Sequence, residues 1–339
     1  MKNIEITKPS RLLNKDGSLA NPGWSRSIVQ KYYRSQIKAS KFRIKEWDYY
    51  LVLNEDFACA FTVSDNGYMG LESVSLLDFK NDWQHTQSVV VPFPMGKFNM
   101  PYTSRAGNVE FHNDTLDIGF IKLEDKRIIK CRFKNFYKGK TFECEIILRE
   151  PKMDSIVVAT PWKEDKKAFY YNQKINCMPA SGKAVFDGRE FVFDPKTDFG
   201  TLDWGRGVWT YDNTWRWGSG NGYVNGKPFG FNIGYGFGNG IATENALFYD
   251  GVIHKLDKVY FHYDDDDYMK PWKFTSDNDR FQMDFVPVMD RYANLDYKII
   301  VSKQHQVFGK MSGTAVLDDG TKVELENLMC FAEVVHNRY

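Results

Sequence analysis

Hydrophobic and polar residues alternate along most of the chain, in short segments that end at Asn, Asp, Gly or Pro. Alternation with a period of two predicts strands that bury one face and expose the other. The Asn66-Gly67 and Asp187-Gly188 pairs favour tight hairpins, because such turns need positive φ angles. The pattern therefore predicts antiparallel meanders, with clear strands over residues 43–53, 57–63, 128–133 and 142–148.

The strand pattern is interrupted by a charged segment, Glu150 to Lys167, which suggests a crossing between two domains. Aromatic hairpins near Trp47 and Trp215 resemble each other, as two similar halves would. Two antiparallel barrels side by side would remove exposed strand edges and leave a cavity or crevice. We expect an N-terminal arm over residues 1–40, a first barrel domain over residues 41–160 and a second over residues 161–339.

Composition and charge limit the classes of molecule that the protein could bind. Lys and Arg total 45 and Asp and Glu total 44, so a net charge of +1 gives no field that attracts nucleic acid. Aromatic residues form 16% of the chain, which favours strands and pockets of lipid or carbohydrate size. We expect no membrane-spanning segment and no signal peptide. The five cysteines form no C-x-x-C pair, so a cytoplasmic location is the simplest interpretation.

The segment from Asp198 to Tyr260 concentrates tryptophan, glycine and titratable side chains. Asp203 lies between Leu202 and Trp204, where apolar neighbours would favour the neutral carboxylic acid over the carboxylate. A carboxylic acid that stays neutral near pH 7 can protonate an alkene or an enolate. The alternative is a carboxylate that pairs with Arg206 and holds the turn.

Other side chains of this segment are candidates for a site. Glu244 and Asn245 follow a glycine-rich loop and could orient a substrate or water, or could stabilise their own turn. His254 could be a general base, although a single histidine is more often a structural hydrogen-bond donor. Arg26 follows a Pro-Gly turn and could belong to a lid or to a packed arm. The aromatic candidates for binding a hydrophobic small molecule are Trp47, Trp204, Tyr211, Trp215 and Trp217.

Metal ions and cofactors are not predicted. The acidic run 264–267 lacks the alternating spacing and the glycine of an EF-hand loop, and such runs are usually solvated. The glycine run 218–222 matches neither a phosphate-binding loop nor a dinucleotide fingerprint. The sequence leaves the number of subunits open.

Several long segments, in the same order, resemble the bacterial family catalogued as domain of unknown function 2804. The central segment, an acid beside an aromatic followed by a Trp-x-Trp strand, is also similar to twin-lipocalin proteins related to carotenoid hydratases and AttH-type proteins. That resemblance implies two lipocalin-like barrels and a proton-donating Asp203; the hydratases carry a histidine where this chain has Trp204. The segments that match the first family are residues 23–26, 43–50, 202–209, 243–246 and 250–256.

The sequence thus predicts an all-β protein of two lipocalin-like antiparallel β-barrels packed side by side. The leading hypothesis is a cofactor-independent hydratase, isomerase or cyclase that acts on an isoprenoid- or lipid-like molecule. Asp203 would be the acid, Glu244 or His254 its counterpart, and Arg206 the orienting cation. The alternatives are a lipocalin-like carrier and a glycan-binding module. Burial separates them, because glycan-stacking platforms must be exposed whereas such an acid needs a closed pocket.

Overall fold

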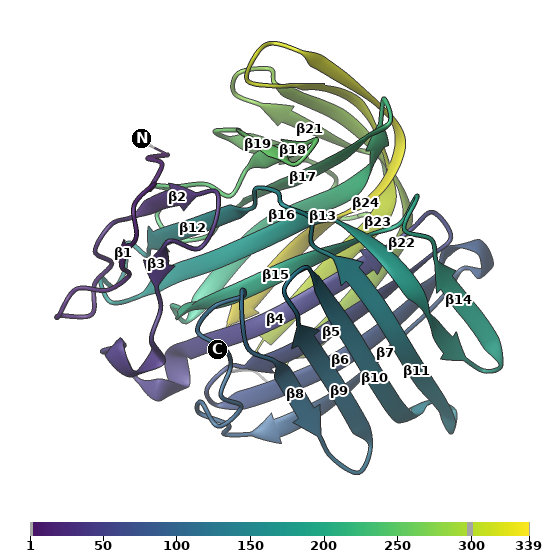
Figure 1. The fold of residues 1–339 in the computed structure, drawn as a ribbon, viewed down its shortest axis with the longest axis horizontal. Helices are drawn as coiled ribbons and strands as arrows, with labels where there is room; N and C mark the ends of the chain where they lie inside the picture. The colour runs from purple at the N-terminus through teal and green to yellow at the C-terminus, as the bar shows by residue number, and fades with distance from the viewer. Residues whose placement is uncertain (1–2, 297–300, 339) are drawn as a thin grey trace.

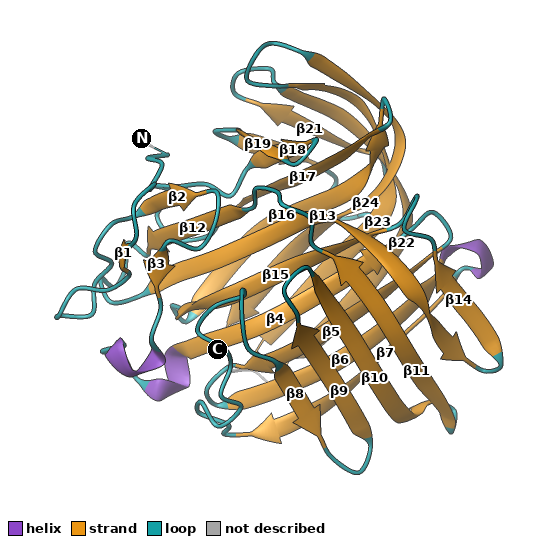
Figure 2. Ribbon diagram, viewed as in Figure 1, coloured by secondary structure: helices purple, strands orange, loops and turns teal. Residues whose placement is uncertain are grey.

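The computed structural model describes residues 3–296 and 301–338 of the chain. Within these ranges the regular structure is almost entirely strand, as Figure 2 shows. The remaining regular elements are short 3-10 turns, η1 (Arg34–Gln36), η2 (Lys41–Arg43) and η3 (Phe79–Asn81). No helix in the described part of the chain has the length and hydrophobicity needed to cross a bilayer.

The first large sheet has thirteen strands, and every pairing in it is antiparallel. Its main order is β7-β6-β5-β4-β15-β13-β11-β10-β9-β8, while β12 and β14 also pair with β13, and β2 pairs with β12. The strands are β2 (Gly23–Ser25), β4 (Ile44–Leu53), β5 (Phe57–Asp65), β6 (Met69–Asp78), β7 (Trp83–Pro92), β8 (Val109–His112), β9 (Leu116–Lys122), β10 (Lys126–Tyr137), β11 (Lys140–Arg149), β12 (Ile156–Pro161), β13 (Phe169–Phe186), β14 (Arg189–Phe193) and β15 (Phe199–Val208).

The second large sheet has nine strands in the order β19-β18-β17-β16-β24-β23-β22-β21-β20, again antiparallel. A separate parallel pair joins β1 (Ser10–Arg11) to β3 (Gln30–Lys31) in the N-terminal segment. The strands of the second sheet are β16 (Asp212–Val224), β17 (Lys227–Tyr235), β18 (Ala246–Tyr249), β19 (Val252–Lys255), β20 (Val259–His262), β21 (Trp272–Ser276), β22 (Phe281–Asp296), β23 (Val301–Val316) and β24 (Lys322–Arg338).

Each sheet curls around its own hydrophobic core, and a third core lies between the sheets. Alternation along β4 shows how one strand serves two of these cores. Tyr50 and Val52 point into the core of the first sheet, whereas Tyr49 and Leu51 point toward the second sheet. There they join Trp217 and other side chains of the second sheet. Both faces of the central strands are therefore covered.

The predicted fold class is confirmed: the protein is all-β, with two curled antiparallel sheets side by side (Figure 1). The chain passes from the first sheet to the second between Val208 and Asp212. The division into an arm and two domains, at residues 40 and 160, concerns domains rather than sheets and stays a prediction.

Candidate functional site

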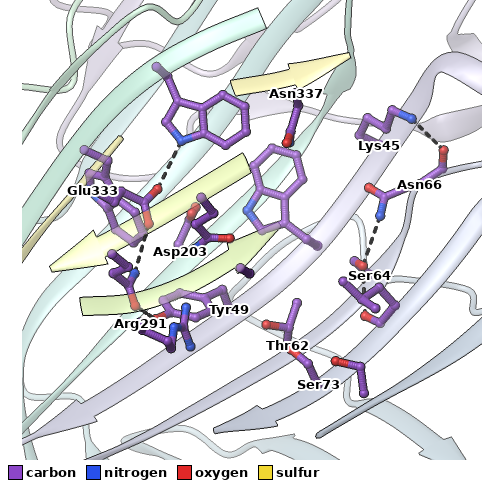
Figure 3. Close-up of a pocket in the computed structure, with 18 of the residues that line it drawn as sticks. Lys45, Tyr49, Thr62, Ser64, Asn66, Ser73, Asp203, Arg291, Glu333 and Asn337 are labelled. Atoms are coloured by element: carbon purple, nitrogen blue, oxygen red, sulfur yellow. Dashed lines mark hydrogen bonds between the residues drawn. The ribbon is translucent and has the colours of Figure 1, made fainter. Parts of the chain in front are cut away.

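A cavity of about 340 Å³ lies between the two sheets (Figure 3). One wall consists of side chains from β4–β7, β13 and β15 of the first sheet. The opposite wall consists of side chains from β16 and β22–β24 of the second sheet, and Phe237 from the loop after β17 completes it. The cavity thus lies where the fold brings together segments from the whole length of the chain.

Aromatic side chains form the apolar part of the lining. The rings of Trp47 and Trp209 meet edge to face with centroids 5.8 Å apart, and Trp209 meets Trp215 in the same way at 5.2 Å. Tyr170 stacks on Phe237 with centroids 4.7 Å apart. Such mutual contacts hold large rings in fixed positions, so this part of the cavity has a preformed shape.

Gly205, two residues after Asp203, makes room for one of these aromatic rings. Gly205 pairs with Trp47 across β15 and β4, and the indole ring lies directly over the glycine. A Cβ atom at this position would stand 2.0 Å from the Trp47 ring. Only glycine therefore lets Trp47 lie flat against the sheet and leaves space above it for the cavity.

Polar side chains cross the first-sheet wall in a single row, one from each of six neighbouring strands. Residues that pair directly across a sheet point to the same face. All members of this first-sheet row line the cavity. In order across the sheet they are Lys174, Asp203, Tyr49, Thr62, Ser73 and Ser88.

Asp203 is buried near one end of the first-sheet row, next to Lys174, and has two polar partners. Lys174 Nζ lies 2.9 Å from Asp203 Oδ2, and Asn172 Nδ2 donates to Asp203 Oδ1 at 2.5 Å. Lys174 is itself buried, with its Nζ 3.8 Å from the centroid of the Trp217 ring. Each member of this ion pair offsets part of the cost of burying the other.

A second polar row, the second-sheet row, faces the first across the cavity. Its members pair directly across β16, β24, β23 and β22 and all line the cavity. The Tyr49 hydroxyl donates to Gln306 Oε1 at 3.4 Å, which joins the two rows. The second-sheet row consists of Trp217, Glu333, Gln306 and Arg291.

Glu333 is a buried carboxyl in this row, only 5% exposed. Its oxygens accept hydrogen bonds from neutral donors, Trp215 Nε1 at 3.0 Å and Gln306 Nε2 at 2.9 Å. Burial raises the pKa of Glu333 to about 7, and the bond from Trp215 and the charge of Arg291 offset only part of this. A carboxyl of this kind can hold a proton near neutral pH and release it to a bound molecule.

Four of the predicted site residues meet at the cavity: Trp47, Asp203, Trp215 and Trp217. Figure 3 shows Asp203 and Glu333 toward one end of it. The alternative partner of Asp203, Arg206, lies elsewhere: it is fully buried and pairs with Asp48 at 3.0 Å. The ion-pair partner of Asp203 is therefore Lys174.

Glu244 lines a smaller cavity of about 240 Å³ that shares Tyr170 and Phe237 with the central one. The Tyr170 hydroxyl donates to Glu244 Oε2 at 3.0 Å, and Lys174 Nζ is 4.0 Å from the same oxygen. Burial raises the pKa of Glu244. Asn245 accepts a hydrogen bond from the Gly234 amide at 2.6 Å and donates to a backbone carbonyl, so its amide holds the local backbone.

The remaining predicted residues lie away from both cavities. Trp204 is buried in the core of the first sheet with Arg206 stacked over its ring at 4.3 Å. His254 accepts from the backbone amide of Asp318 at 3.2 Å, and Tyr211 is 56% exposed. Arg26 pairs with Glu5 and Asp154. In the described part of the chain, no group of three His, Cys, Asp or Glu side chains could hold a metal ion.

Lys174 and Glu333 are buried charged residues of the cavity that the sequence prediction missed. Both are single charges inside buried strand segments, 168–178 and 329–335. An isolated charge in an apolar strand is costly unless it has a partner, so its presence there is a usable signal. The sequence does not show which strand supplies that partner.

The fold and the cavity define a class of protein in which two curled β-sheets enclose one central pocket. The chain belongs to the family described as domain of unknown function (DUF2804), whose model matches residues 3–339. A search of curated protein sequences finds no match.

Solved structures that this chain matches include the following two. Kievitone hydratase from Nectria haematococca superposes with a TM-score of 0.56 at 11% identity, over 96% of this chain and 98% of the hydratase. A protein provisionally named AttH from Nitrosomonas europaea gives a TM-score of 0.44 at 13% identity, over 89% of this chain and 96% of that one. At such low identity the likeness to the hydratase shows the fold alone.

Proposed function

We propose that the central cavity is the active site of an enzyme that adds water to a carbon–carbon double bond of a small molecule, or removes it. The observation that carries this proposal is Glu333, a buried carboxyl whose pKa is raised to about 7. In the described residues the Glu333 side chain takes part in no ion pair, whereas Asp203 in the opposite wall is paired with Lys174. Two carboxyls in different environments are what acid–base catalysis at neutral pH requires.

In the hydration direction, neutral Glu333 donates its proton to one alkene carbon, and the π electrons form the new C–H bond. The other carbon becomes cationic, and the face of Trp215 stabilises it. Water attacks this carbon, and the Asp203 carboxylate takes the proton that water releases. The cycle closes when Asp203 gives up its proton to solvent and Glu333 regains one. Dehydration follows the same steps in reverse.

These roles differ from those expected from the sequence, where Asp203 was the acid and Glu244 or His254 its counterpart. The reason is the ammonium of Lys174, which forms an ion pair with Asp203 at 2.9 Å. Within the described residues Glu333 forms no ion pair, and the charges of Arg291 and Lys174 act on it only from a longer distance. Trp215 and Gln306 position the Glu333 carboxyl through their hydrogen bonds. That one protein of the same fold is named a hydratase agrees with the proposal.

The experiment that tests this proposal uses heavy-oxygen water. The protein is incubated with alkenes of several classes, namely isoprenoid alcohols, unsaturated fatty acids and alkenyl phenols, and with their hydrates. Mass spectrometry then follows uptake of the heavy oxygen or loss of water. We expect turnover of at least one pair, and Glu333→Gln should lower it about 100-fold to 10,000-fold, as loss of a general acid does.

Glu72→Gln is the matched control. Glu72 is also a buried carboxyl, with its pKa raised to about 8, but it does not line the cavity. Its variant should turn over substrate like the unmodified protein. Equal turnover by Glu333→Gln would contradict the proposal. Tight binding with no turnover by the unmodified protein would instead favour the carrier.

A further inference from the structure

The outer half of the first-sheet row is a line of small hydroxyl side chains. Thr62, Ser73 and Ser88 pair directly across β5, β6 and β7, so their side chains point to the same face. Within the described residues, the hydroxyls of these three form no hydrogen bond, although each lines the cavity. By contrast, the hydroxyl of Thr86, which lines the same cavity, is bonded to Ser75 at 2.8 Å.

The geometry of the sheet fixes the spacing of these free hydroxyls. Neighbouring strands lie about 4.8 Å apart, so the distance from Thr62 to Ser88, two strands away, is about 10 Å. A ligand that bonds to all of them must carry several oxygens spread along its length. Hydroxyls donate and accept equally well, so they suit ligand groups that do the same.

Exposure increases along the same row. Asp203 and Tyr49 are buried, Thr62 and Ser73 are half-buried, and Ser88 is exposed. The cavity is therefore open to solvent at the β7 end, whereas Glu333 and Trp217 lie deep inside it. Figure 3 shows Thr62 and Ser73 on one side of the pocket and Glu333 on the other. A ligand that follows this gradient has its polar part at the mouth and its apolar part inside.

The cations in the outer part of the cavity already have hydrogen-bond partners. Arg291 donates to the Ser75 hydroxyl at 2.9 Å. Lys45 is buried, donates to the backbone oxygen of Asn66 at 2.9 Å, and stands 4.2 Å from the Tyr68 ring centroid. Burial lowers the pKa of Lys45 to about 7, so its charge is partly lost at neutral pH. Neutral hydroxyl groups are therefore the better match for this wall than a carboxylate or a phosphate.

We infer that the substrate is amphipathic, with a neutral group that carries several hydroxyls bound along Thr62, Ser73 and Ser88 and an apolar, reacting part bound beside Trp217 and Glu333. This inference rests on the proposed function, because it takes the cavity as the substrate site, and it names the substrate class. The hydroxylated group is either a sugar or a polyphenol, which share this hydrogen-bonding chemistry.

The test compares three saturated or unreactive probes by isothermal titration calorimetry: octyl glucoside below its micelle concentration, hexylresorcinol and octanol. Octyl glucoside and hexylresorcinol present a sugar and a phenol with similar chains, and octanol presents a single hydroxyl. At least one of the first two should bind about tenfold or more tightly than octanol, because several hydrogen bonds are gained. Which of the two binds more tightly identifies the hydroxylated group.

The triple variant Thr62→Val, Ser73→Ala, Ser88→Ala removes the free hydroxyls with little change in shape. Each lost hydrogen bond weakens binding about threefold to tenfold, so the preference over octanol should fall to about threefold or less. Thr86→Val is the matched control, since the hydroxyl of Thr86 already has a partner, and it should keep the preference. Thermal unfolding of each variant verifies that the fold is intact.

Equal affinity for the three probes, no binding of any, or an undiminished preference in a folded triple variant would overturn the inference. None of the probes needs to react, so the result is independent of turnover. If the hydroxylated probes are preferred but no alkene is hydrated, the substrate class stands and only the enzymatic proposal fails. Glu333→Gln should retain the preference, because it leaves the hydroxyl wall unchanged.

Discussion

The two walls of the central cavity each carry one buried carboxyl, in opposite electrical surroundings. In the first sheet, Asp203 lies 2.9 Å from the ammonium of Lys174 and accepts a further bond from Asn172. In the second sheet, Glu333 accepts bonds only from neutral groups, the indole of Trp215 and the amide of Gln306. Both carboxyls are buried, so burial does not distinguish them. The difference is the cation, which forms an ion pair with Asp203 and not with Glu333.

The difference shows how one cavity can hold an acid and a base at the same pH. A charged donor compensates the desolvation of Asp203, so the carboxylate is stabilised. At Glu333, neutral donors compensate only part of the desolvation cost of the carboxylate, so the pKa of Glu333 is raised to about 7. The division follows from the strand register, which places Lys174 beside Asp203 and Gln306 beside Glu333.

Lys174→Met should have the largest effect on stability, because it makes the first wall resemble the second. It leaves Asp203 without its cation and also removes the positive charge 4.0 Å from Glu244. Removing one partner of a buried ion pair costs about 3–5 kcal/mol, which urea unfolding would measure. The double variant with Asp203→Asn should regain part of this loss.

The control for Lys174→Met is Lys130→Met. Lys130 pairs with Glu145 at 3.2 Å, but both side chains are more than half exposed, so this change should have little effect. If Lys174→Met were no more destabilising than Lys130→Met, the buried Lys174–Asp203 ion pair would contribute no more to stability than an exposed one, which would contradict this account.

Glu333→Gln should change how stability depends on pH. Between pH 4.5, the usual pKa of a glutamate, and pH 7, native Glu333 keeps a proton that the unfolded chain loses. The free energy of unfolding therefore falls by about 3 kcal/mol as the pH rises through this window, and levels off above it. The Gln variant should lack this fall, as urea unfolding at several pH values would show.

Glu72→Gln provides the comparison for that series. Burial raises the pKa of Glu72 to about 8, so its own loss of stability extends to higher pH. The difference in the free energy of unfolding between the unmodified protein and the Glu72 variant should therefore keep growing above pH 7. The corresponding difference for the Glu333 variant should level off there. If the free energy of unfolding depended on pH in the same way for both variants, the pKa of Glu333 would not be near 7.

Gly205→Ala should have the smallest effect, because it changes the apolar part of the first wall and neither carboxyl. The new methyl group would overlap the Trp47 ring, 2.0 Å away, and the ring would have to move into the cavity. Overpacking of this kind costs about 1–3 kcal/mol. Gly119→Ala is the control, since the nearest atom would be 3.8 Å away. Thermal unfolding should separate the two; equal melting temperatures would contradict the close packing of Trp47.

Much of the fold could be predicted from the sequence because it depends on local patterns. Alternation along residues 43–53 and 57–63 predicts β4 and β5, and Asn66-Gly67 predicts the turn that follows. The pairing of β15 with β4 could not be predicted, because it joins residues about 150 positions apart through side-chain packing. The same difficulty leaves the domain division at residue 160 a prediction.

The site was predictable where a short motif carries it. Trp47, Asp203, Trp215 and Trp217 stand out by their composition, and all four line the cavity. Lys174 and Glu333 reach the same cavity only through the register of β13 with β15 and of β24 with β16. Trp204 and Arg206 are close to Asp203 in sequence but do not line the cavity. Side chains alternate between the two faces of a strand, so residues one or three positions from Asp203 point to the opposite face.

The most direct test of the proposed acid is an NMR titration of the side-chain carboxyl carbons of Glu, assigned with Glu333→Gln. We predict a Glu signal that titrates near pH 7 and is absent from the Glu333 variant. A Glu333 signal that ionises near pH 4.5 would contradict the assignment of Glu333 as the acid.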